Sequence, residues 1–230
     1  EGFVRQVLGW REFVRHVHRA TAGFTEVDVP TDDDLRAAPN HLEACNPLPP
    51  AWWEGTPSGL ACLDTVVSDV WRTGYSHHIT RLMVLSNLAT LLDVSPRELT
   101  DWFWVAYADA YDWVVEPNVL AMGTFAVSDL MTTKPYVSGS NYLHKMSDYC
   151  EGCAFDPKKN CPITPLYWAF LERKRDVLQG NHRLALPLAS AKKRSADQKE
   201  ADAETFERVS ELLGNGEALV PDQLTLALAK

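Results

Sequence analysis

The sequence predicts an all-α protein, and three observations support this. Apolar residues recur at intervals of three and four along several segments, which is the spacing of one helix face. Serine, threonine and proline precede these segments in the order that helix starts prefer. No segment shows the alternation of a convincing strand, and no repeat is visible. Two consecutive apolar helices, expected over 76–92 and 96–113, would form the centre of the fold.

The N-terminal part predicts one amphipathic helix followed by a long loop. Apolar residues repeat at helical spacing over 2–18. This pattern is already under way at Glu1, so we expect it to continue into a segment upstream. Residues 25–58 are rich in Pro, Asp and Asn and predict an ordered loop, with a short helix near 31–37.

Capping residues predict where the other helices begin and end. The expected helices are Ser58–Arg72 ending at Gly74, Ser76–Leu92, Ser95–Trp113, and Thr164–Val177 ending near Gly180. Pro117 and Gly123 are expected to interrupt the chain after the third helix, and 131–161 is expected to be irregular. A charged amphipathic helix is expected over 195–213.

We expect one helical domain over 1–194, followed by a charged C-terminal helix and tail over 195–230. Hydrophobic residues make up 46% of the chain and charged residues 23%, as in ordinary globular proteins. The sequence has no run of eighteen apolar residues and no secretory pattern at its start, so we expect a cytoplasmic protein with no membrane partner.

The net charge of −9 argues against a nonspecific nucleic-acid binder, which would be basic. Local basic clusters could still contact DNA, or they could be ordinary solvated helix faces. These clusters are Arg5, Arg11, Arg15 and Arg19, and the run Lys192-Lys193-Arg194.

Three of the five cysteines form the motif Cys150-x2-Cys153-x7-Cys161. Thiolates two residues apart on a turn can face one metal site, and Cys62 or Cys45 would supply a fourth ligand. The spacing alone leaves open a 4Fe–4S cluster, a structural zinc, or cysteines that bind no metal. A disulfide scaffold is not expected, because the number of cysteines is odd and the chain is not a short secreted one.

Two adjacent histidines stand at the start of the helix expected over 76–92. Their side chains point about 100° apart, so they cannot share one helix face. His77 shares the face of Arg81, whereas His78 shares that of Leu82. Either histidine could exchange a proton near neutral pH, or serve only as a hydrogen-bonded structural residue.

Three acids follow the apolar run of the helix expected over 96–113, namely Asp109, Asp112 and Glu116. Buried acids need a partner, and Arg81 of the preceding helix is available. Such a pair could lie beneath a polar cofactor ring, or the acids could belong to a solvated helix end.

The same helix is expected to carry five aromatic residues. Most aromatic side chains of this kind belong to the core. In a redox protein, a few could relay an electron between a buried cofactor and the surface. They are Trp102, Trp104, Tyr107, Tyr111 and Trp113.

Taken together, these segments resemble the iron–sulfur bacterial cryptochromes and photolyases, the prokaryotic (6-4) photolyase branch of the photolyase/cryptochrome family. The resemblance rests on residues 1–13, 74–81 and 109–118, and on Cys62, Cys150, Cys153 and Cys161. It extends over roughly 1–194 and implies a helical FAD-binding catalytic domain with a 4Fe–4S cluster on those four cysteines, leaving Cys45 free. It also implies that two parts of such proteins are absent here. One is the N-terminal α/β domain, where a lumazine antenna would be expected, and the other is the segment that contacts the FAD phosphates.

The resemblance further implies light-driven repair of pyrimidine (6-4) pyrimidone photoproducts by electron transfer from reduced FAD. The expected partner is UV-damaged DNA, bound by a monomer. By position, His78 is expected to protonate the lesion, with His77 beside it. Flavin contacts are expected from Arg81, Asp109 and Asn118. Tyr136 and Trp10 are expected to border the lesion pocket, and Trp102 to relay electrons. Animal (6-4) photolyases carry a second histidine where this chain has Leu82, so schemes with two histidines are not expected to apply.

Three alternatives remain open at this stage. A cryptochrome blue-light sensor of the same fold would bind flavin without repairing (6-4) lesions. An iron–sulfur nucleic-acid-binding module resembling the primase large subunit would bind DNA without flavin or a response to light. A zinc-stabilised interaction domain would be exposed by metal analysis.

Overall fold

A computed structural model describes residues 1–31 and 38–224 of the chain. Within these ranges the chain is helical, with no sheet and only two isolated β-bridges, Thr31–Pro39 and Asn46–Val94. This confirms the all-α prediction. The short helix expected near 31–37 falls almost entirely outside the described residues. Among the described helices, none combines the length and the apolar character needed to cross a bilayer.

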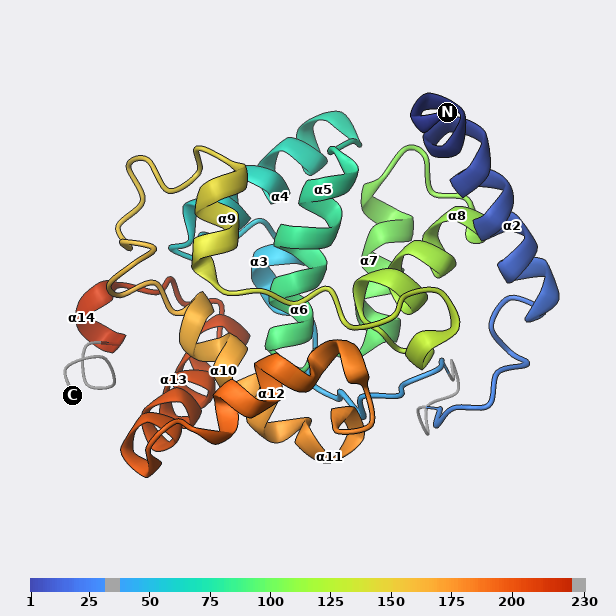
Figure 1. The fold of residues 1–230 in the computed structure, drawn as a ribbon. Helices are drawn as coiled ribbons and strands as arrows, with labels where there is room; N and C mark the ends of the chain where they lie inside the picture. The colour runs from blue at the N-terminus through green and yellow to red at the C-terminus, as the bar shows by residue number, and fades with distance from the viewer. Residues whose placement is uncertain (32–37, 225–230) are drawn as a thin grey trace.

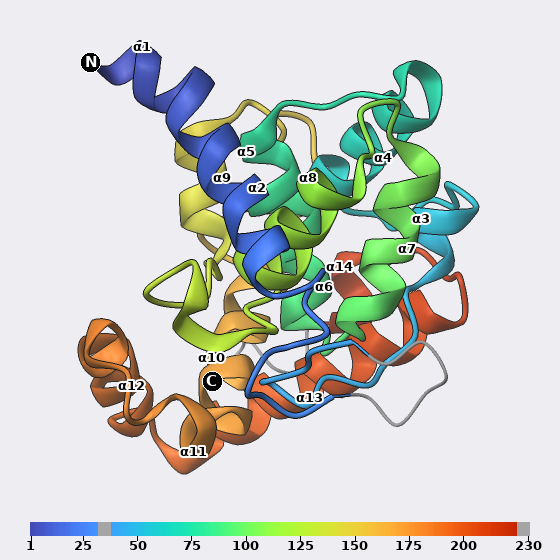
Figure 2. The same cartoon turned by 90° about the vertical axis from the view of Figure 1, so that its right-hand side faces the viewer.

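The N-terminal helix lies along one edge of the molecule (Figure 1). It runs without a break through α1 (Gly2–Val4), η1 (Arg5–Gly9, with π-helical hydrogen bonds) and α2 (Trp10–Ala20). This confirms the helix predicted over 2–18. Its first half projects beyond the body (Figure 2), and Phe3 is 79% exposed. Val14 of α2 is the one buried residue between Gly2 and Ala20, so the C-terminal half of this N-terminal helix attaches it to the body.

The centre of the fold is built from the helices that the apolar pattern predicted. In chain order they are α4 (Ala61–Thr73), α5 (His78–Thr80), η2 (Arg81–Ser86), α6 (Asn87–Leu91) and α7 (Pro96–Ala106). The segments α5, η2 and α6 follow one another directly and form one rod. Buried side chains from α4, this rod and α7 belong to one hydrophobic core.

Two predicted helix caps are wrong. The residue before α4 is Leu60, so Ser58 lies two residues before the cap position. Its hydroxyl donates to Asp64 Oδ1 at 2.6 Å instead. The rod is capped by His77, whose Nδ1 accepts the amide hydrogen of Ile79 at 3.1 Å. The hydroxyl of Ser76 instead shares a 2.7 Å hydrogen bond with Tyr107. In both places a tertiary or loop contact takes the serine that sequence reasoning gave to the cap.

The helix predicted to reach Trp113 ends at Ala106, because the chain becomes extended at Tyr107. The next amide, of Ala108, donates to the carbonyl of Gly74 at 2.9 Å and ties this loop to the end of α4. Gly74 ends α4 as predicted. Its φ of 65° favours glycine, and a Cβ there would lie 3.1 Å from that of Ala108.

The interruption predicted at Pro117 does not occur. Helix α8 (Asp112–Glu116) continues into η3 (Pro117–Gly123). The hydrogen bonding changes to the π type at Pro117, and the helix continues although proline has no N–H to donate. The helix ends at Gly123, as the sequence suggested.

Several short elements escaped prediction, because three to eight residues carry too few periodic positions to be recognised. They are α3 (Pro50–Trp53), η4 (Ser128–Leu130), α9 (Ser140–Met146), η5 (His182–Leu184), α12 (Ala185–Lys192) and α14 (Pro221–Leu224). Apart from α9, the segment 131–161 is irregular, as predicted.

The C-terminal helices cover one end of the molecule (Figure 1). The helix predicted from Thr164 to Val177 is divided at Lys174 into α10 (Ile163–Arg173) and α11 (Arg175–Leu178). The predicted terminal helix is α13 (Ala196–Gly214), with a capping box formed by Ser195 and Gln198. It packs against α10 and joins the main core. The proposed domain boundary at 194 stays a prediction.

Gly123→Ala should lower the free energy of unfolding by about 1–3 kcal/mol. An added Cβ would lie 2.7 Å from the hydroxyl oxygen and 2.9 Å from the Cβ of Ser86, a buried residue of the rod. Denaturant unfolding measures the loss. Gly214→Ala is the matched control, because a Cβ at the end of α13 meets nothing within 4 Å. Equal stability of the two variants would contradict this close approach.

Candidate functional site

A cavity of about 280 Å³ lies where the start of the rod faces the loop after α7 and the helix α8–η3. Its polar lining comes from Arg81 on the rod, Asp109 in the loop and Asn118 on η3. His78 and Phe103 also line it. The structure therefore brings together the three residues that were expected to contact a flavin.

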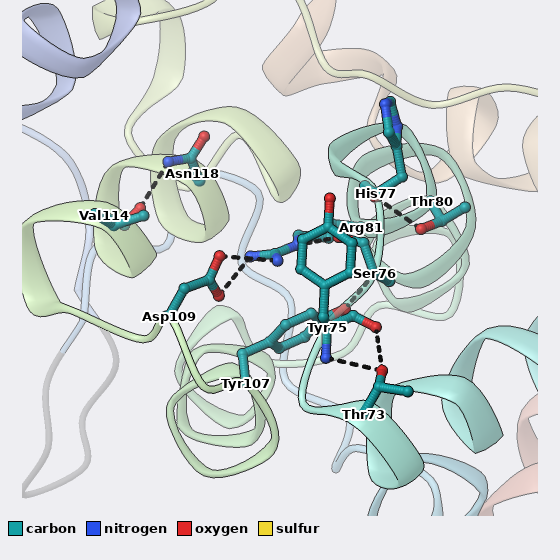
Figure 3. Close-up of polar contacts among 10 residues, drawn as sticks. All are labelled: Thr73, Tyr75, Ser76, His77, Thr80, Arg81, Tyr107, Asp109, Val114 and Asn118. Carbon is teal, nitrogen blue, oxygen red and sulfur yellow. Dashed lines mark hydrogen bonds and ion pairs between the residues drawn. The ribbon is translucent and has the colours of Figure 1, made fainter. Parts of the chain in front are cut away.

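The guanidinium of Arg81 is held on all sides (Figure 3). Its two terminal nitrogens donate to the two carboxylate oxygens of Asp109, both at 3.0 Å, and Nε donates to the carbonyl of Ser76 at 3.0 Å. The guanidinium carbon lies 4.1 Å from the ring centre of Tyr107 and 5.5 Å from that of Tyr75. Of the two alternatives for the acids, the structure shows the ion pair for Asp109. The result is a fixed, planar cation at the wall of the cavity.

Asn118 adds a fixed amide to the same wall. Its Nδ2 donates to the carbonyl of Val114, one turn earlier, at 2.7 Å. Its Oδ1 points away from this bond (Figure 3). An amide held in this way presents its oxygen as a hydrogen-bond acceptor.

A second, larger cavity of about 540 Å³ adjoins the first. His78 and Asn118 line both, so these side chains form a shared wall. The other side of the second cavity is aromatic and comes from Trp10 on α2, Trp113 on α8 and Tyr136 in the irregular segment. The structure thus brings His78 together with Trp10 and Tyr136.

The pKa of His78 is lowered from its ordinary value, chiefly by burial and then by the positive charges of Arg81 and His77. The neutral imidazole is therefore favoured between the two cavities at neutral pH.

The structure places His77 away from both cavities. Its ring caps the rod and points away from the Arg81–Asp109 pair (Figure 3). It lines a separate groove with Met146 and Tyr149, on the side of α9. Adjacent helix-start residues diverge by about 100°, which accounts for the different surroundings of His77 and His78.

Trp102 lines neither cavity and lies one side chain behind the first. It is fully buried and donates its indole N–H to the carbonyl of Trp52 at 2.8 Å. Its ring meets Phe103 edge-on at 5.3 Å, and Phe103 lines the cavity. On its other side it meets the half-exposed ring of Trp71 at 6.4 Å.

Four cysteines act on one another electrostatically. Burial raises the pKa of Cys62, and the neighbouring Cys161 and Cys153 raise it further. Burial likewise raises the pKa of Cys161 to about 12, and raises that of Cys150. Cys45 is exposed. Over 1–31 and 38–224, no three His, Cys, Asp or Glu side chains are grouped closely enough to hold a metal ion.

Two residues that the sequence offered only within larger groups, Tyr107 among the aromatics and Arg11 among the basic residues, lie beside these cavities. Tyr107 supports Arg81 from below, and Arg11 lies 5.8 Å from the ring centre of Trp113 at the second cavity. The helix predicted over 96–113 contains both Tyr107 and Trp113, so the prediction does not distinguish their separate surroundings. The position of Arg11 beside Trp10 was the available signal.

Comparison with known proteins decides the family. Residues 3–157 match the family model described as the FAD binding domain of DNA photolyase. This chain belongs to the photolyase/cryptochrome family. The part of this photolyase-family chain that matches contains both cavities and Cys62, Cys150 and Cys153, whereas Cys161 and the helices from α10 onward follow it.

Two relatives of this photolyase-family chain differ in how far they extend. A (6-4) photolyase of Agrobacterium fabrum (strain C58 / ATCC 33970) is 40% identical over 202 residues, which cover 86% of this chain and 38% of that protein. An uncharacterised protein, R855, of Acanthamoeba polyphaga mimivirus is 35% identical over 104 residues, 45% of this chain and 81% of that protein. The chain therefore spans well under half the length of the (6-4) photolyase it matches.

Proposed function

We propose that the chain binds the flavin ring of FAD in the first cavity and that the protein repairs (6-4) photoproducts in UV-damaged DNA in a light-driven reaction. The observation that carries this proposal is the shared wall. A polar cavity suited to a flavin adjoins an aromatic cavity suited to a base, and His78 and Asn118 face both. The 40% identity to a (6-4) photolyase supports this choice of lesion.

The residues of the first cavity fit a flavin ring. Its volume, about 280 Å³, is near the lower end of ligand pockets, so it suits a flat ring system better than a whole dinucleotide. A flavin ring has carbonyl oxygens that can accept from Arg81 and a ring nitrogen that can donate to Asn118 Oδ1. Asp109 neutralises Arg81 and keeps its plane fixed. When bound, FAD supplies the light absorption and the one-electron donation.

The second cavity fits a base that has left the duplex. Photolyases in general extrude the damaged nucleotide into a pocket, as is known for the class. The rings of Trp10, Trp113 and Tyr136 offer faces on which an extruded base can stack. Arg11 above Trp113 places a positive charge near this cavity, where a DNA phosphate could lie.

His78 is the proton donor in this proposal. It lies in the shared wall, so an imidazole nitrogen can reach a base in the second cavity. The proton is held on that nitrogen until the lesion accepts it. Because the pKa of His78 is lowered, the charged form is a minor one at neutral pH.

Repair should therefore decline as the pH rises through the lowered pKa of His78, because only the imidazolium can give a proton. The midpoint should lie below about 6.5, the ordinary value for histidine. Single-turnover repair of a (6-4) oligonucleotide between about pH 5 and about pH 8 measures this. A rate that rises with pH over this range would contradict the assignment.

We also propose that Cys62, Cys150, Cys153 and Cys161 hold a 4Fe–4S cluster. The raised pKa values of Cys62, Cys150 and Cys161 mean that thiolates are costly at these positions without a positive charge nearby. Iron supplies that charge, and cluster ligands are thiolates. Such a cluster would tie the irregular segment 131–161 to α4.

The role of Trp102 as an electron relay is a further part of the proposal. Its ring contacts extend from Phe103 at the first cavity to Trp71 near the surface. A monomeric, cytoplasmic protein and a C-terminal unit over 195–230 stay predictions.

The decisive experiment combines absorption, iron analysis and a repair assay on the purified protein. We expect a flavin band near about 450 nm, iron in the preparation, and restoration of (6-4) lesions only under illumination. Flavin photoreduction without repair would favour the sensor. Zinc without flavin would overturn the proposal.

A further inference from the structure

Two walls of the second cavity come from two helices, and a side-chain contact outside the cavity links these helices. Trp10 and Val14 line the cavity from α2, and Trp113 lines it from α8. His18 continues the face of Trp10 and Val14 at the same four-residue spacing. There it meets Glu116, which lies one turn beyond Trp113 on the opposite helix.

The contact between the two helices is close and largely shielded from water. His18 Nε2 lies 2.8 Å from Glu116 Oε2, and their side chains are 23% and 13% exposed. The ring of His18 also packs edge-on against the buried ring of Phe24, with centres 6.2 Å apart. Both partners are therefore fixed, and one proton lies between them whichever side carries it.

Besides this contact, the C-terminal half of α2 is held by Val17, which packs against the buried cluster that contains Phe24 and Leu120. Neither α1 nor η1 has a buried residue, and α2 has only Val14. The contact of Arg11 with Trp113 lies at the cavity itself. The placement of Trp10 and Arg11 thus depends on how the C-terminal half of α2 is held.

We propose that His18 and Glu116 are positioning residues that set the width of the second cavity and, through it, the preference for damaged over undamaged DNA. This inference rests on the proposed function. Neither residue lines the cavity, so the pair acts through α2 and the side chains of Trp10 and Arg11. Stacking and hydrogen bonding of an extruded base require these walls to stay within a fraction of an ångström.

The test measures dissociation constants in the dark, so that no repair intervenes. Fluorescence anisotropy compares a labelled duplex carrying one (6-4) photoproduct with the same duplex undamaged. Glu116→Leu should weaken binding of the damaged duplex about tenfold and leave the undamaged duplex nearly unchanged. Glu116→Gln should keep the preference, because the amide can still hydrogen-bond to His18. Flavin content should not change, because α2 does not line the first cavity.

A control separates positioning from general stability. Asp202→Asn alters another part-buried ion pair, with Arg194 on the C-terminal helices, and should lower stability without changing the preference. His18→Leu should match Glu116→Leu, and the double variant should lose no more than either one. An unchanged preference in Glu116→Leu, or an equal loss of preference in Glu116→Gln, would overturn the positioning role of His18 and Glu116 but not the proposed function. Absence of any preference in the unaltered protein would overturn the proposed function as well.

Discussion

His78→Ala should abolish repair of (6-4) photoproducts while FAD remains bound. The imidazole faces both cavities, so its removal takes the proton donor from the lesion without touching the Arg81–Asp109 pair. General acid catalysis by a positioned side chain contributes at least about a hundredfold, which sets the smallest loss we expect. Repair yield per absorbed photon measures the effect, with flavin absorbance as the check on cofactor content.

His77→Ala is the matched control, because the neighbouring histidine has the same chemistry and lies outside both cavities. It should retain most of the repair activity. Loss of its cap on the amide of Ile79 should cost about 1 kcal/mol of stability. Normal repair by the His78 variant, or loss of repair in the His77 variant alone, would remove His78 from the proposed role.

Cys62→Ser should remove iron from the protein and lower its melting temperature. Cys62 is buried on α4 at the edge of the main core, and a serine hydroxyl cannot replace a thiolate ligand. Metal binding and folding are coupled, so we expect a loss of about 3 kcal/mol or more, or about 6–12 °C. Iron analysis and thermal unfolding measure the two effects.

Cys150→Ser should behave in the same way, because Cys150 is another of the four proposed ligands. Cys45→Ser should keep both iron and stability, because Cys45 is exposed and is not among the cysteines that act on Cys62. Iron retained in the Cys62 and Cys150 variants would refute the ligand assignment.

The fold was predictable where long apolar periodicity decides it. The rod from His78 to Leu91 and the terminal helix α13 carry enough repeats to be recognised, and Gly74 and Ser195 end or start helices as their chemistry suggests. The end of α7 was not predictable. The residues after Ala106 keep an apolar, aromatic pattern, and only the tertiary bond from Ala108 to Gly74 turns the chain there.

The site was partly predictable for a related reason. Asp109 and Arg81 could be paired, because the acid follows the apolar helix next to the one that begins near Arg81; the expected burial of the acid is wrong, since half of the Asp109 side chain is exposed. The different surroundings of His77 and His78 follow from helix geometry once the helix start is fixed. The two-sided position of His78 was not predictable, since Trp10 and Tyr136 come from distant segments whose docking depends on the whole fold.

The shared wall has a consequence for how such proteins can diverge. A substitution at His78 or Asn118 alters both chambers at once, so these positions have little freedom to vary independently. The far side of the larger chamber, with Trp10, Trp113 and Tyr136, can change without disturbing the smaller one. Under the proposed function, new lesion preferences can therefore evolve on that side, while the residues proposed to hold the flavin are inherited unchanged.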